Sequence, residues 1–156
     1  MATAGFEFAY NLDGTNAPPV IRDFTLGVAA LHKKGDVMTI QADGFIDQNA
    51  GSLKEATCIM AETVAAADMT AEVTTAKAAI VNSNQVWRCS SDAATAATAL
   101  PWAIKRLDTV DANTIDADDV TNGNMMPVEW GGLDSDGNLI IYVVFTKTSL
   151  GFHAPA

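Results

Sequence analysis

The chain has 156 residues, of which 49% are hydrophobic, and carries a formal net charge of −10. This length fits one domain, with or without an arm, and the hydrophobic content is enough to fill a core, which argues against disorder throughout. Because nineteen acidic residues face nine basic ones, the field around the molecule repels phosphate backbones and anionic headgroups, so we expect neither nucleic acid nor membrane as a partner.

The N-terminus has no basic segment followed by a long apolar one. No later stretch approaches the eighteen or so apolar residues of a membrane span. These two observations predict a soluble chain that is not exported.

Residues 1–19 are predicted to form an N-terminal arm, and residues 20–156 a single β-rich domain. Phe6, Phe8 and Tyr10 recur at every second position, which places all three aromatic rings on one face of an extended segment. Such a face needs another surface to cover it. That surface is either the core of this domain or a neighbouring subunit, and the sequence leaves both open.

After a second apolar stretch at 20–31, the chain shows a β-hairpin pattern, with strands expected at 37–40 and 45–46. Glycine reaches positive φ at no steric cost, and aspartate bonds its own backbone in a turn, so both residue types favour this geometry. The turn residues of the segment are Lys34, Gly35, Asp36, Asp43 and Gly44.

Short β-prone runs separated by Gly, Asn and Asp continue to the C-terminus. They span residues 56–60, 74–81, 86–89, 127–130 and 139–146. The last is the most apolar and is predicted to be a central strand. Residues 61–69 read as a loop or one helical turn, and residues 99–107, with Pro101 near the start, as a short helix. The fold class is therefore mainly β, a small β-barrel or β-sandwich with an extended N-terminal arm and at most one or two short helices.

The two cysteines, Cys58 and Cys89, match no metal-ligand spacing and both fall in expected strands. A disulfide would require neighbouring strands, and two buried thiols are the favoured interpretation.

Residues 108–124 carry five aspartates and are predicted to be an exposed excursion. A solvated acidic loop is the favoured interpretation of residues 108–119, and a divalent cation held by its carboxylates is the alternative. The Asp134-Ser135-Asp136-Gly137-Asn138 run resembles the start of a calcium loop, but Val143 stands where the final glutamate ligand is needed, so we interpret it as a turn. We assign no metal or cofactor site.

Catalytic groupings are not apparent. His32 and His153 are the only histidines, and no Ser/His/Asp or Cys/His set follows from spacing. We therefore do not expect an enzyme.

Five segments, taken in order after the aromatic arm, resemble the head decoration (cement) proteins of tailed bacteriophages. They are KKGDVMTIQADGFID, CIMAE, VWRC, NGNMMPVEWGGLD and LIIYVVF. Lys34, Gly35, Asp36, Val37, Asp43 and Gly44 occupy places of a motif common in that group. The resemblance extends weakly over about residues 5–150, and the acidic loop has no counterpart in it.

The resemblance implies a small β-barrel or sandwich that binds the outer surface of an assembled capsid, usually as a trimer, and clamps neighbouring capsomers. The implied partners are the major capsid protein and sister subunits, and the implied location is the virion. The arm residues Phe6, Phe8 and Tyr10 are then the expected contact residues. Alternatives are a tail-tube or head-completion protein, or a carbohydrate- or host-surface-binding module in which Trp87, Trp102 and Trp130 are exposed stacking platforms.

Overall fold

The computed structural model describes residues 5–49, 55–96, 101–102, 107–119 and 123–148. This part of the chain holds eleven β-strands and one short 3-10 helix, η1 (Ala66–Asp68). The strands are β1 (Glu7–Asn11), β2 (Ile21–Thr25), β3 (Val37–Ile40), β4 (Ile46–Gln48), β5 (Cys58–Met60), β6 (Thr75–Ile80), β7 (Gln85–Ser90), β8 (Asp108–Asp111), β9 (Thr114–Asp116), β10 (Met125–Leu133) and β11 (Leu139–Phe145). The mainly β class is confirmed.

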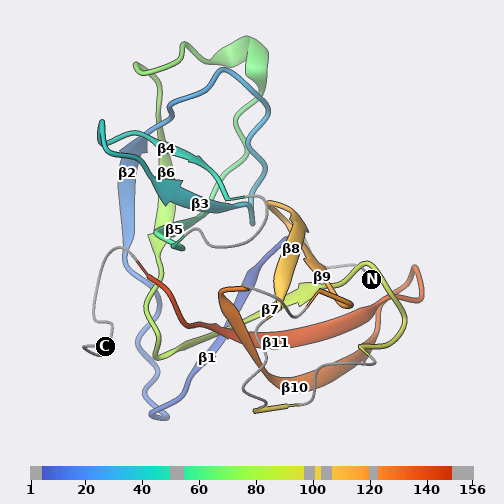
Figure 1. Ribbon diagram of the computed structural model, residues 1–156. Coiled ribbons are helices and arrows are strands. Elements are labelled where there is room, and N and C mark those ends of the chain that lie inside the picture. The colour runs from blue at the N-terminus through green and yellow to red at the C-terminus, as the bar shows by residue number, and fades with distance from the viewer. Residues whose placement is uncertain (1–4, 50–54, 97–100, 103–106, 120–122, 149–156) are drawn as a thin grey trace.

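The strands form two larger sheets and one small hairpin (Figure 1). The four-stranded sheet has the order β1-β7-β11-β10, the five-stranded sheet β2-β6-β5-β3-β4, and β8 pairs with β9. No sheet closes into a barrel within the described residues. A single parallel bridge joins Leu26, directly after β2, to Ile46 of β4, so the five-stranded sheet curls toward its own first strand without closing.

The main core lies between the two larger sheets and includes Phe6, Trp87, Ile141 and Phe145. Along β11 every second side chain, from Leu139 to Phe145, enters this core, as the two-residue period of a strand requires. β11 lies between β7 and β10, which confirms the predicted central strand.

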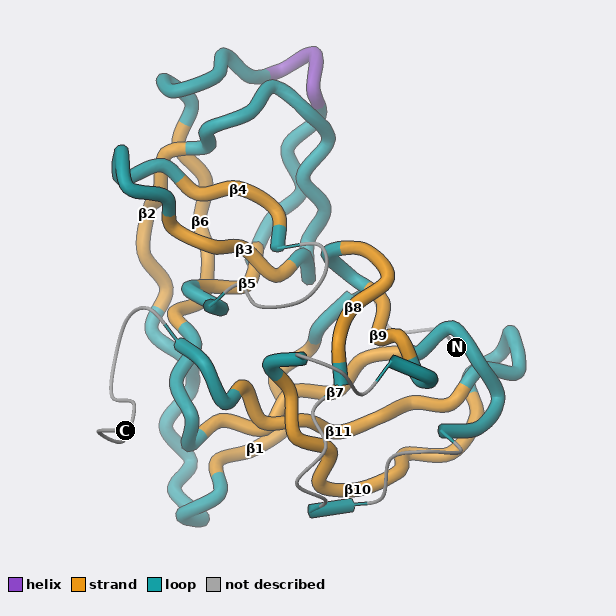
Figure 2. The backbone as a smooth tube through the Cα atoms, in the orientation of Figure 1, coloured by secondary structure: helices purple, strands orange, loops and turns teal. Residues whose placement is uncertain are grey.

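A second core covers the opposite face of the five-stranded sheet. Leu26, Met38, Ile46, Cys58 and Met60 belong to it, each at most 1% exposed. The long loop that follows β5 closes this core and carries η1, the only helical turn drawn in Figure 2. A loop or a single helical turn at 61–69 is therefore confirmed.

The hairpin of β3 and β4 has the predicted turn chemistry. Gly44 has a φ of 89°, and the Asp43 carboxylate accepts a hydrogen bond from the Phe45 N–H at 3.1 Å. At the entrance to β3, Gly35 has a φ of 91° and its N–H donates to the Met60 carbonyl at 2.8 Å. Both turn predictions are confirmed.

The expectation of a separate N-terminal arm is corrected by the structure. The segment Glu7–Asn11 is β1, an edge strand paired antiparallel with β7, and Phe6 is only 2% exposed. The register shifts between Phe8 and Tyr10, which is a β-bulge. The extra residue rotates Tyr10 to the opposite face of the sheet, so the three aromatic rings do not share one face as predicted.

The expectation of an exposed acidic excursion is also corrected. Residues 108–116 form the β8–β9 hairpin, and Ile115 and Asp108 are 0% and 5% exposed. Burial raises the pKa of the Asp108 carboxyl, and the charges of Asp119 and Asp116 raise it further. A hydrogen bond from the Thr109 N–H acts in the opposite direction. Most of the predicted helix at 99–107 lies outside the described residues, and Pro101 and Trp102 form a turn.

The described residues contain no helix with the length and apolar character to cross a membrane. Both cysteines are buried free thiols, which agrees with the favoured interpretation. Burial raises the pKa of the Cys58 thiol to about 12.

Candidate functional site: an apolar groove between the sheets

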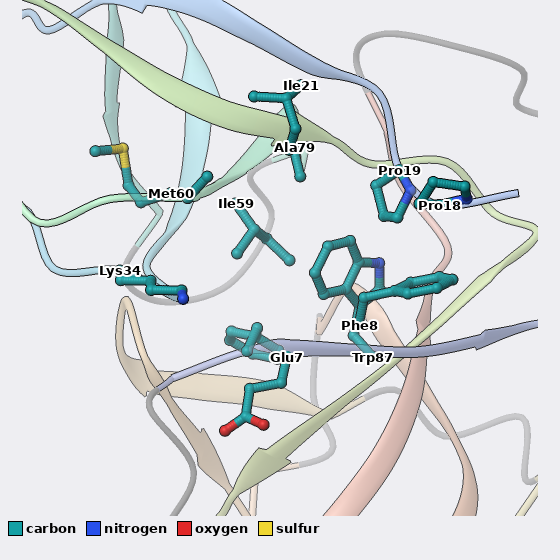
Figure 3. A pocket seen from close by; sticks show the side chains of 12 residues that line it. Glu7, Phe8, Pro18, Pro19, Ile21, Lys34, Ile59, Met60, Ala79 and Trp87 are labelled. Carbon is teal, nitrogen blue, oxygen red and sulfur yellow. The ribbon is translucent and has the colours of Figure 1, made fainter.

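The candidate site is a hollow of about 680 Å³ where the edges of the two larger sheets meet. We call it the inter-sheet groove. Its apolar lining includes Phe8, Pro18, Pro19, Ile21, Ile59 and Trp87. Figure 3 shows the rings of Phe8 and Trp87 on one side, the two prolines beside them, and Ile21 and Ile59 on the side of the five-stranded sheet.

A cross-strand aromatic pair forms one wall of the groove. Phe8 of β1 lies opposite Trp87 of β7, and their rings meet edge to face with centroids 5.6 Å apart. The Trp87 indole N–H donates to the Gln85 side-chain oxygen at 3.2 Å, which fixes the orientation of the ring. The wall is therefore rigid and needs little ordering when a partner binds.

A small residue between two large ones creates the hollow in the other wall. Ala79 of β6 pairs with Ile21 of β2 on one side and with Ile59 of β5 on the other. Paired residues in neighbouring strands project from the same face of a sheet. The alanine therefore leaves space between two isoleucines, and the groove occupies that space.

Two charged residues line the groove, and they differ in how they are compensated. Glu7 accepts a hydrogen bond from the Arg88 guanidinium at 2.8 Å, and the same contact is the main reason that the pKa of Arg88 is raised. Lys34 is exposed, and its ammonium has no hydrogen-bond or ion-pair partner among the described residues. The groove thus has one neutralised anion and one available cation.

The apolar surface extends beyond the groove. Val20 and Ile21 are 50% and 44% exposed. A second hollow of about 490 Å³ lies next to Pro18, with Ala17 and Val20 among its lining residues. This strip of exposed apolar side chains runs along the start of β2, the edge strand of the five-stranded sheet. Contiguous exposed apolar surface of this kind is typical of a contact surface.

The arm residues predicted as contacts lie in three different environments. Phe6 is a core residue whose ring packs on Phe145 with centroids 5.4 Å apart, so it cannot serve as an outward contact in this structure. Phe8 is half-buried and lines the groove. Tyr10 is on the outer face, where its hydroxyl donates to Glu129 at 2.7 Å.

The predicted turn motif is not assembled into one site. The Lys34-Gly35-Asp36 corner lies beside the groove, whereas Asp43 and Gly44 form the tip of the β3–β4 hairpin. Sequence reasoning missed most of the groove residues. The sequence held one signal of the groove, the run of two prolines and two aliphatic residues at 18–21. The structure shows that Val20 and Ile21 of this run are exposed.

The three tryptophans that the alternative carbohydrate-binding function would need as stacking platforms differ in exposure. Trp87 is 3% exposed and belongs to the core, and Trp130 is partly buried against it. Trp102 is 59% exposed and is the one member of the set with the exposure that stacking requires.

Within the part of the chain that the structure describes, no three His, Cys, Asp or Glu side chains come close enough to hold a metal ion. What the groove offers is apolar surface next to a single cation, which suits binding through burial. Comparisons with protein-family models, curated proteins and solved structures found no match. The groove therefore carries the functional proposal.

Proposed function

We propose that this chain is a non-enzymatic structural protein that binds the outer surface of an assembled tailed-phage capsid and stabilises contacts between capsomers. The observation that carries the proposal is the inter-sheet groove, a rigid apolar hollow continuous with exposed Val20 and Ile21. The order of sequence segments that resembles decoration proteins supports it. The proposed partner is the major capsid protein, with sister subunits of a homotrimer as second contacts and the virion surface as the location.

The energetics of such a surface suit a repeated lattice. Burying apolar area contributes about 25 cal/mol per Å², so the exposed parts of two or three aliphatic side chains supply only a modest free energy of binding. Ordering and association costs reduce it further. A protein with two or more contacts on a lattice converts such weak contacts into retention through effective concentration.

The alternative functions have less support from the side chains. A carbohydrate-binding module of the predicted kind needs exposed tryptophans, and Trp102 alone has that exposure among the three. A tail-tube or head-completion protein would have a similar composition and would bind a different assembly.

The test is cosedimentation with undecorated capsids of the phage that encodes the chain. We expect the wild-type protein to pellet with these capsids and Ile21→Asn to lose most of its occupancy. The matched control is Val110→Asn, which changes a similarly exposed strand residue of β8 outside the groove. A wild-type protein that stays in the supernatant at tens of micromolar, or equal loss in both variants, contradicts the proposal.

A further inference from the structure

We infer that the inter-sheet groove receives an apolar segment of the capsid partner in which a carboxylate lies against Lys34. This inference rests on the proposed function and specifies the chemistry of the partner at the same site. Three features of the groove define that chemistry. They are its apolar walls, its size and the charge at its end.

The walls and the volume select an apolar occupant. A hollow of about 680 Å³ falls within the range of about 300–1,000 Å³ typical of ligand sites. Phe8 and Trp87 supply aromatic surface on one side, and Ile21 and Ile59 supply aliphatic surface on the other (Figure 3). A charged side chain placed between these walls would lose hydration without gaining a partner.

The charge at the end selects an anion. Arg88 already compensates Glu7 through hydrogen bonds of 2.8 and 3.3 Å, so Glu7 does not call for a cation from the partner. Lys34 has no such compensation among the described side chains, and its backbone is held by a hydrogen bond from its N–H to the Thr63 hydroxyl at 2.9 Å. A carboxylate is the complementary group for an ammonium on a positioned backbone.

The chemistry of the groove is tested with two fluorescent probes that share one apolar body. 1-Anilinonaphthalene-8-sulfonate carries an anion, and N-phenyl-1-naphthylamine is the same body without it. Lys34→Met keeps the apolar stem and removes the charge, and we expect it to weaken the anionic probe about two- to fivefold, the range of an exposed ion pair, with the neutral probe unchanged. Ile21→Asn should weaken both probes.

Lys33→Met is the matched control, because it removes the same charge from the adjacent residue, which does not line the groove. We expect it to leave both probes at the wild-type affinity. Equal effects of Lys33→Met and Lys34→Met on the anionic probe would overturn the assignment of the anion to Lys34.

The partner segment is tested with the same variants on capsids. Lys34→Met should lower capsid occupancy and Lys33→Met should not. If both variants bind capsids like the wild type, the inference fails while the proposed function stands. If the wild type does not bind capsids, the proposed function fails and the capsid segment with it, whereas the two probes still report the groove chemistry. A dimer or trimer in analytical ultracentrifugation that Ile21→Asn dissociates would make a second copy the occupant and overturn the inference.

Discussion

Phe6→Ala should destabilise the fold strongly, because the ring belongs to the main core and not to a docking arm. Phe6 is 2% exposed and packs against Phe145. Truncating a buried phenylalanine to alanine costs about 3–5 kcal/mol. For a chain of this length each kcal/mol lowers the melting temperature by about 2–4 °C, so the expected decrease is about 6–20 °C.

Urea unfolding with linear extrapolation measures this change, and an unchanged slope would show that stability alone has altered. Two other variants serve as comparisons, one in the same segment and one elsewhere on the surface. Tyr10→Phe removes only the exposed hydrogen bond to Glu129 and should cost about 1 kcal/mol or less. Val110→Ala, at a side chain that is 52% exposed, should change little. A Phe6→Ala protein with the wild-type midpoint but reduced capsid binding would refute the core assignment and restore the docking arm.

Three further predictions concern ionisation and strain. Burial is the main cause that raises the pKa of Tyr10 from 10.0 to about 12, and the hydrogen bond and charge of Glu129 add to it. Because the folded state holds this proton more tightly, the contribution of Tyr10 to stability is complete below pH 10 and is lost between pH 10 and about 12. Glu129→Gln should therefore move the later step of tyrosinate absorbance in a pH titration to lower pH. Cys58, with its pKa raised to about 12, should react with Ellman's reagent at pH 8 only after unfolding. Gly5→Ala should lower the free energy of unfolding in urea more than Gly14→Ala does. Both glycines have positive φ, but only a methyl group added at position 5 would meet backbone, 2.6 Å from the Gly35 oxygen. Equal losses in the two variants would contradict this contact.

The strands that sequence reasoning placed well are those bounded by turns with local chemistry. The hairpin of β3 and β4 follows from Gly35, Asp43 and Gly44, whose backbone preferences act within a few residues. The central position of β11 follows from its unbroken apolar run, since a strand buried by neighbours on both edges and against a core tolerates few polar side chains.

The features that sequence reasoning missed depend on contacts between distant segments. The bulge in the middle of β1 has no sequence signature, yet it decides that Tyr10 faces away from Phe8. The β8–β9 hairpin was obscured by its aspartates, although the apolar Val110 and Ile115 lie on either side of an Ala112-Asn113 turn. The Val37 N–H donates to the Ala112 carbonyl at 2.8 Å, and such a contact cannot be derived from either segment alone.

The Lys34-Gly35-Asp36 corner shows how turn residues position a charged side chain that lines the inter-sheet groove. Asp36 is buried and accepts hydrogen bonds from the Lys33 N–H at 2.9 Å, from Gln48 at 2.8 Å and from Asn113 at 3.1 Å. These bonds join the corner to β4 and to the β8–β9 turn.

Gly35 completes the attachment of the corner to the two sheets. Its carbonyl accepts a hydrogen bond from the Phe6 N–H at 2.9 Å, and its N–H donates to Met60. The residue is thus fixed between the start of β1 in one sheet and the end of β5 in the other. Because Lys34 immediately precedes it, the ammonium of Lys34 starts from a backbone held at the junction of the two sheets. The turn chemistry that places this corner is therefore also what places the available cation at the end of the groove.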